Sequence, residues 1–315
     1  MQIIKRSNGQ VFLFANALLW GSSYIWSKML LSYIPRFSIL LICAVAGLVV
    51  TAVMFYPSIR HITVTTLLIS MAISGLSIAS NTFCMLALQY TSSSNTAFIV
   101  QMSVVMTPLI MALMEKRRPE AKTVICSMLA LVGIFLLTGD ISSFRLKAGD
   151  ILALCNALFF SLYLVALKMA ANKVNSVHFT FIHHSMNSLV FLVLVLFLER
   201  GRLNAGVLAN PTVLLLLAAS ALVVIFTTLV QSTSIKFVRP EKATIIYTME
   251  PVTAAILAFF LLGEKLSGIK AVLGCMLILM AVIFSAVKSR KKKGAVQDMP
   301  KAGILEEHSH KLQAN

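Results

Sequence analysis

The residue whose type and setting point most directly to chemistry is Glu250, an acid followed by a proline inside a long apolar stretch. A carboxylate among apolar residues normally faces the interior of a helix bundle, where it can bind an amine or carry a proton. Because Pro251 has no amide hydrogen, the carbonyl of Tyr247 loses its helical hydrogen bond, which predicts a break in the helix. Two interpretations stay open here: a carboxylate that binds substrate or a coupling proton, and one that holds the broken helix together.

Other polar side chains also fall inside apolar stretches and are candidates to line a cavity. The residues that we expect to bind substrate are Trp20, Tyr24, Asn81, Gln101, Ser161, Tyr163, Gln231, Tyr247 and Glu250. Asn16, Ser23 and Asn156 belong to the same inner polar set. The ring of Trp20 can stack on a substrate or face its cationic group. For each residue singly, a hydrogen bond between helices is the simpler interpretation, so the expectation depends on the set as a whole.

The composition places these residues in a membrane protein. Of 315 residues, 58% are hydrophobic and 12% are charged, whereas soluble domains carry about 25% charged residues. This argues against a soluble enzyme or a disordered protein. The five cysteines lie in apolar stretches without CxxC spacing, so neither a disulfide framework nor a metal site is expected.

Ten apolar stretches have about the 20 residues that a membrane-spanning helix needs. They are residues 11–31, 37–55, 65–88, 96–114, 123–139, 149–171, 179–198, 212–235, 243–262 and 268–287. The first stretch is too long for the apolar core of a signal peptide, so we expect it to remain as a span. The predicted fold class is an all-α polytopic membrane protein.

The net charge of +16 is interpreted as a topological signal rather than a nucleic-acid surface. With the N-terminus inside, 19 of the 27 Lys and Arg residues fall on the cytoplasmic side and 8 on the other side, as the positive-inside rule expects. We therefore predict a multi-pass protein of the inner or plasma membrane with both termini cytoplasmic. The basic run Lys288–Lys293 is expected to lie on anionic lipid headgroups.

Matching residues in the two halves predict an internal repeat. Asn16 to Gly21 and Asn156 to Ser161 match at an offset of 140, and Met102-Ser103 matches Met249-Glu250 at an offset of 147. Five helices per repeat is an odd number, so the second repeat is expected to enter the membrane from the opposite side. The predicted units are residues 1–140, residues 146–288 and a disordered cytoplasmic tail, 289–315.

Four short motifs make the chain resemble the EamA-type family of the drug/metabolite transporter superfamily. They are Trp20-Gly21-Ser22-Ser23, Gly149-Asp150, Glu250-Pro251-Val252 and Leu262-Gly263-Glu264-Lys265. The resemblance covers about residues 10–288 and implies ten helices in two inverted five-helix repeats. It also implies export or uptake of a small metabolite, commonly an amino acid, without ATP hydrolysis. The first repeat departs from the family pattern, with Val104 in place of a common proline and Pro108 four residues later, so its helix break is expected to be displaced.

The predicted function is a secondary transporter that exports an amino acid or related compound by alternating access, driven by a substrate gradient or by protons. No nucleotide-binding loop and no catalytic-triad or HExxH spacing occurs in the sequence, so neither ATP drive nor an enzyme is expected. No cofactor or nucleic-acid partner is expected, and the protein would be a monomer or a homodimer. The alternatives are a nucleotide-sugar or sugar-phosphate exchanger, which would need Lys or Arg in its cavity, and a non-transporting membrane sensor or enzyme.

Overall fold

The computed structural model describes residues 8–90, 99–138, 148–201, 205–262 and 268–287. Within these ranges all regular structure is helical, as a chain buried in lipid requires, because helices satisfy their backbone hydrogen bonds internally. The first half contains α1 (Gly9–Leu30), α2 (Arg36–Ile59), α3 (Val64–Tyr90), α5 (Ser103–Met114) and α6 (Ala121–Thr138). The second half contains α7 (Ala148–Ala170), α8 (Ser176–Leu198), the short 3-10 helix η2 (Ala205–Ala209), α9 (Pro211–Ser234), α10 (Pro240–Tyr247), α11 (Met249–Leu262) and α12 (Gly268–Ala286).

Seven segments of the described chain are long and apolar enough to cross a membrane. They are Arg36–Ile59, Val64–Ala87, Ala148–Ala170, Ser176–Leu198, Pro211–Ser234, Pro240–Leu261 and Gly268–Ala286. Ser103–Met114 and Ala121–Leu137 are shorter apolar helices. The prediction of an all-α, multi-pass membrane protein is confirmed. Residues 1–7, the boundary between the predicted halves and the basic tail lie outside the described ranges.

Large apolar side chains cover the outside of the bundle, and polar side chains are concentrated within it. Leu113, Phe197, Phe260 and Ile269 are each at least 74% exposed, whereas Asn16, Gln231 and Thr248 are at most 1% exposed. This is the reverse of a soluble protein, in which exposed apolar area of this extent would drive association. Lipid tails therefore take the place of water around the bundle.

Local sequence explains where several helices begin. Asn175 caps α8 by accepting a hydrogen bond from the amide of Val177 (2.8 Å). Asn210 caps α9 in the same way and is followed by Pro211 in the first helical position, where a missing amide hydrogen costs nothing. These caps set the turns through which α8 and α9 enter the bundle.

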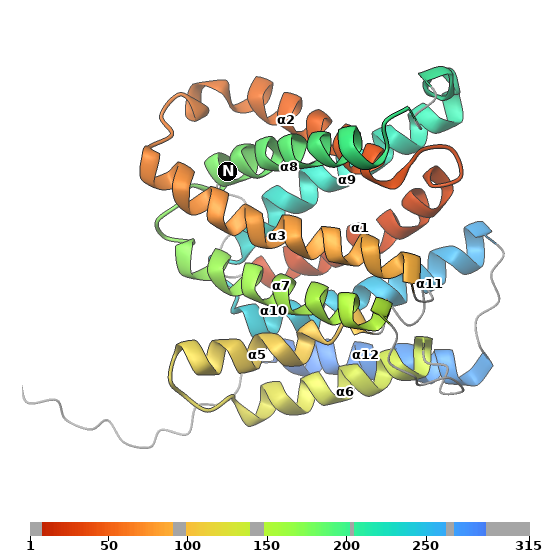
Figure 1. Cartoon of the computed structure of the whole chain (residues 1–315). Helices are drawn as coiled ribbons and strands as arrows, with labels where there is room; N and C mark the ends of the chain where they lie inside the picture. Colours follow the sequence, from red (N-terminus) through yellow and green to blue (C-terminus); the bar gives the residue numbers. More distant parts are fainter. Residues whose placement is uncertain (1–7, 91–98, 139–147, 202–204, 263–267, 288–315) are drawn as a thin grey trace, which may run out of the picture.

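Helices from the two halves pack against each other throughout the bundle. In Figure 1, α2, α8 and α9 lie on one side, α1, α3 and α7 cross the middle, and α5, α6 and α12 lie on the other side. The main neighbours are α2 with α8, α3 with α7, α6 with α12, and α1 with both α9 and α11. The core contains side chains of α1, α7 and α10, among them Leu13, Leu164 and Ile245.

The pairs α2–α8 and α6–α12 are antiparallel. Glu199, just after α8, binds the first turn of α2, while His178 in the first turn of α8 is 2.8 Å from the carbonyl of Ser58, near the end of α2. Lys122, near the start of α6, contacts the carbonyl of Val287, just after α12. The two helices of each pair therefore run in opposite directions.

The segment expected as a single span over 243–262 is broken into two helices. Helix α10 ends at Tyr247, Thr248 forms a turn, and α11 begins at Met249. The break lies four residues before Pro251, at the carbonyl that this proline leaves without a partner. A similar turn occupies Gln101–Met102, just before α5, and Pro108 lies inside α5. The break in the first half is therefore before Ser103 and has not been displaced to Pro108.

Candidate functional site

Four aromatic rings meet where α1, α7 and α10 cross. The ring of Trp20 lies 5.4 Å from that of Tyr247 and 6.0 Å from that of Phe160, measured between centroids. Phe160 is 6.2 Å from both Tyr163 and Tyr247. These separations are typical of tilted aromatic pairs. Tyr163 and Tyr247 are buried, whereas Trp20 and Phe160 are half-buried, so the latter two keep part of their surface open.

A chain of hydrogen bonds connects the polar groups around these rings. The Tyr163 hydroxyl donates to Gln231 Oε1 (2.8 Å), and Gln231 Nε2 donates to the Tyr247 hydroxyl (3.0 Å). Asn16 Nδ2 donates to the same hydroxyl at 3.4 Å. The chain joins α7, α9, α10 and α1, four helices drawn from both halves of the sequence. Asn16 Oδ1 is buried and accepts no hydrogen bond from the described residues, so an acceptor is left free beside the rings.

Glu250 lies in the first turn of α11, three residues beyond Tyr247 and across the turn at Thr248. The residue is 6% exposed. Among the described residues, its carboxylate has no ion pair or hydrogen-bond donor that could neutralise it. The start of a helix favours a negative charge, which helps to keep the acid at this depth. The site thus combines aromatic rings with a carboxyl group that has no charged partner among the described side chains.

A glycine brings α1 against the backbone of Glu250. A Cβ atom on Gly21 would lie 2.7 Å from the carbonyl oxygen of Glu250 and 2.6 Å from Cβ of Thr253. Only a glycine permits this approach, because the nearest atoms belong to the backbone and to a Cβ that cannot rotate away. Trp20 is the preceding residue, so this close approach of α1 occurs directly beside the ring that packs on Tyr247.

Ring contacts and hydrogen bonds bring together four of the nine residues predicted to bind substrate: Trp20, Tyr163, Gln231 and Tyr247. A fifth, Glu250, follows Tyr247 by three residues, and its backbone carbonyl lies against Gly21, next to Trp20. Ser161 instead donates to the carbonyl of Ala157 (2.8 Å) and to that of Ser103 (3.5 Å), so it joins α7 to α5. Gln101 is buried in the turn before α5, and Asn81 is exposed on α3. The side chain of Tyr24 lies outside the described part of the chain.

Phe160 and Asn16 join the site although neither was among those nine residues. Phe160 occupies the position that matches Trp20 at the offset of 140, and this signal was present in the sequence. Asn16 was in the wider polar set, but its pairing with Tyr247 spans 231 residues. Asn156, its counterpart, instead donates to the carbonyl (2.7 Å) and the hydroxyl (2.9 Å) of Ser80.

The fold and the site define the class as a multi-pass membrane protein with a polar centre between helices. Residues 7–139 and 147–287 match the EamA-like transporter family, and the chain belongs to that family, part of the drug/metabolite transporter superfamily. It is 26% identical over 286 residues to an uncharacterized transporter of Archaeoglobus fulgidus, covering 90% of this chain and 88% of that protein. A crystal structure of a protein at 17% identity has the same fold, with a TM-score of 0.75 over 90% of this chain and 97% of the other. The protein is therefore a membrane transporter.

Proposed function

We propose that the protein is a secondary transporter that exports a small metabolite carrying a protonated amine, an amino acid or a related compound. The observation that carries this proposal is Glu250, a buried carboxylate with no basic partner among the described residues, next to the cluster of Trp20 and Tyr247. A cation entering the site would meet both the carboxylate and ring faces, which attract positive charge. The driving force is a substrate gradient or protons carried by the same carboxylate.

Matched contacts in the two halves support a mechanism based on ten spans in two inverted repeats. Gly21 of α1 touches the carbonyl of Glu250, and Ser161 of α7 donates to the carbonyl of Ser103. Gly21 corresponds to Ser161 at the offset of 140, and Ser103 corresponds to Glu250 at the offset of 147. Both halves also have a turn shortly before this matched pair. It lies at Gln101–Met102 before Ser103, and at Thr248 before Glu250.

The antiparallel pairs support the inversion as well. In the proposed repeat, α2 corresponds to α8 and α6 corresponds to α12, and the helices of each pair run in opposite directions. Inverted repeats place substrate near the middle of the membrane at their interface, where one repeat rocks against the other. The aromatic cluster, built from α1, α7 and α10, occupies that interface.

Two other functions are less well supported. A nucleotide-sugar or sugar-phosphate exchanger needs a basic side chain at the site, but Lys168, at the end of α7, already donates to the carbonyls of Ile235 (2.9 Å) and Lys236 (2.8 Å). An intramembrane enzyme needs convergent acid, base or metal-binding groups. Among the described residues, no three His, Cys, Asp or Glu side chains gather as a metal site would require.

The experiment is uptake into proteoliposomes by the purified protein, using a panel of radiolabelled amino acids and amines with and without a pH gradient. We expect at least one amine to move, and Glu250→Gln to reduce its initial rate at least about tenfold, since a buried charge pair with a ligand is worth several kcal/mol. The matched control is Glu120→Gln, an exposed acid between helices, which should transport at the parent rate. Wild-type transport by Glu250→Gln for every compound in the panel would contradict the proposal.

A further inference from the structure

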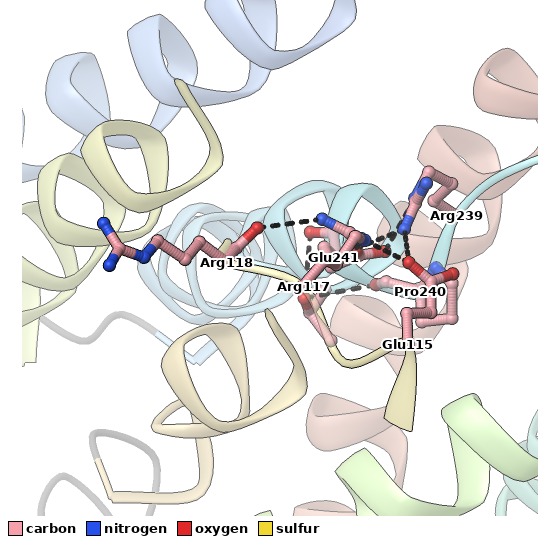
Figure 2. Close-up of polar contacts among 7 residues, drawn as sticks. Glu115, Arg117, Arg118, Arg239, Pro240 and Glu241 are labelled. Carbon is pink, nitrogen blue, oxygen red and sulfur yellow. Dashed lines mark hydrogen bonds and ion pairs between the residues drawn. The ribbon is translucent and has the colours of Figure 1, made fainter. Parts of the chain in front are cut away.

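Four charged residues form a closed network at one end of the bundle, where α5 ends and α10 begins (Figure 2). Glu241 accepts hydrogen bonds from Arg117 Nη2 (2.7 Å) and Arg239 Nη2 (3.1 Å). Glu115 accepts from Arg239 Nη2 (2.7 Å) and is also paired with Arg117 Nε. Each acid therefore contacts both arginines, and each arginine contacts both acids. We call these four residues the ion-pair ring.

The ion-pair ring joins the two halves of the chain. The partners Arg117 and Glu241 are 124 residues apart, as are Glu115 and Arg239, and they belong to separate stretches that match the family. This end also contains Arg118, Lys122, Lys236 and Lys242. In the proposed orientation it is the cytoplasmic end. Among the described charged side chains, the ion pairs between the end of α5 and the start of α10 are those of the ion-pair ring.

The acid at the centre of the ring is buried. The Glu241 side chain is 7% exposed, whereas those of Arg117 and Arg239 are 28% and 40% exposed. An exposed ion pair contributes little, but a buried carboxylate depends strongly on its partners. A guanidinium is charged at any physiological pH, so both arginines are available to hold the Glu241 carboxylate.

An unusual turn aims Arg117 at Glu241. Helix α5 ends in a Schellman motif, in which Arg117 N donates to the carbonyl of Ala112 (2.9 Å) and Lys116 N to that of Leu113 (3.2 Å). Lys116 has φ = 49°, the left-handed conformation that this motif requires and that normally favours glycine. The backbone thus accepts strain in a conformation that directs the guanidinium across to the other half.

Helix α10 connects the ion-pair ring to the aromatic site. It has 8 residues, about 12 Å of helix, with Glu241 in its first turn and Tyr247 at its end. Beyond Tyr247, the turn at Thr248 separates it from α11 and Glu250. Helix α10 thus connects the ion-pair ring directly to the Tyr247 hydroxyl that Gln231 and Asn16 bind.

We propose that the ion-pair ring of Glu115, Arg117, Arg239 and Glu241 is a gate that closes the α5–α10 end of the transport path and opens by separating α5 from α10. The proposal rests on the function proposed above, because a gate has meaning only in a protein that alternates its access. In the closed state, the two arginines hold the start of α10 against the end of α5. Opening separates both acid–arginine pairs that cross between the halves and frees α10 to carry Tyr247 away from the site.

The test measures access from that end with a reporter cysteine. Thr244 lies in α10 one turn deeper than Glu241 and is 1% exposed, and its hydroxyl donates to the carbonyls of Pro240 (3.3 Å) and Glu241 (3.1 Å) in its own helix. Thr244→Cys is introduced into a chain whose native cysteines are replaced by alanine, and a membrane-impermeant maleimide is added to vesicles of both orientations. We expect this parent to be labelled slowly. Adding Arg117→Gln or Glu241→Gln should make labelling about tenfold faster, from one side of the membrane only, because a larger fraction of the protein is then open.

The matched control is Arg118→Gln, which removes the same charge one residue along the chain. The Arg118 side chain points away from the ring in Figure 2, and only its carbonyl contacts Arg117. Labelling of this variant should equal that of the parent. A fourfold reversal, Glu115→Arg, Arg117→Glu, Arg239→Glu and Glu241→Arg, restores every pair and should return the rate to within about twofold of the parent.

Equal labelling of the parent, Arg117→Gln and Glu241→Gln would overturn the proposal, and so would fast labelling of the fourfold reversal. If a single variant does not fold, judged by its elution in detergent, a second measurement decides. Arg117→Cys with Glu241→Cys is cross-linked by a short bismaleimide, which should abolish exchange of the amine identified in the uptake assay. Undiminished exchange after cross-linking would refute a gate here. Because labelling requires no substrate, a failed uptake panel and a failed gate are distinguishable.

Discussion

At the scale of single residues, the site depends on side chains that are present and on one that is absent. Glu250 supplies a carboxyl group, Trp20 and Tyr247 supply ring faces, and Gly21 supplies the space that lets α1 approach α11. The Trp-Gly pair in α1 therefore works as a unit, because the glycine sets the depth at which the tryptophan ring meets Tyr247. A larger residue at position 21 would displace the ring as well as the backbone.

Gly21→Ala tests this close approach. The added Cβ would overlap the Glu250 carbonyl, so we expect a loss of about 1–3 kcal/mol in stability, a lower melting temperature in detergent and slower uptake. Gly75→Ala is the control, because a Cβ there has no neighbour within 4 Å and alanine favours a helix. If both variants melt and transport alike, the close contact between α1 and α11 is not required.

At the scale of helices, the α2–α8 pair is tied at both of its ends. Glu199 accepts from the amides of Phe37 (3.0 Å) and Ser38 (2.9 Å) and from the Ser38 hydroxyl (2.9 Å). At the other end, His178 contacts Ser58. Glu199 is 4% exposed, so it serves as a capping group for α2 that is supplied by the other half of the chain. This pair is expected to stay together while α5 and α10 separate.

Glu199→Ala removes this cap. The first amides of α2 lose their acceptor, and leaving buried donors unsatisfied costs about 1–3 kcal/mol. We expect a reduced melting temperature, followed by tryptophan fluorescence on heating in detergent. Glu120→Ala, which removes an exposed acid, should melt with the parent. A Glu199→Ala variant that is as stable as Glu120→Ala would show that the cap is dispensable.

At the scale of the whole molecule, the distribution of basic residues predicts the orientation in the membrane. In the predicted topology, 19 Lys and Arg residues lie on one side of the membrane and 8 on the other. The α5–α10 end lies on the side with 19, which the positive-inside rule assigns to the cytoplasm. Both chain termini would then be cytoplasmic, and the ion-pair ring would control exchange with the cytoplasm. The opposite end of the bundle includes the cap formed by Glu199.

Reporter fusions measure this orientation. A fluorescent protein fused after Asn315 should be bright in cells, because it would fold in the cytoplasm, and a phosphatase that is active only outside the cytoplasm should be inactive at the same position. The same phosphatase inserted after Tyr33, between α1 and α2, should be active. Activity at Asn315 and none after Tyr33 would reverse the assigned orientation and place the ion-pair ring on the outer side.

Much of the fold and part of the site could be predicted from the sequence alone. Apolar length depends on the local sequence, so the membrane-spanning class was predictable, and so was the break before Pro251, because a proline removes one known hydrogen bond. Burying a charge in lipid is energetically unfavourable, so an acid inside an apolar stretch identified Glu250 as a candidate site residue. These features do not depend on what the residues touch.

The partners were decided by the tertiary structure. Tyr247 meets Asn16 across 231 residues, Arg117 meets Glu241 across 124, and Phe160 completes the aromatic cluster. Such pairs depend on the register and crossing of packed helices, which a glycine contact such as that of Gly21 adjusts by ångströms. Hydropathy contains no information at that resolution. The sequence by itself therefore determined that this is a polytopic helical membrane protein with an acid at its centre, and only helix packing decided which rings surround that acid and which charges join the two halves.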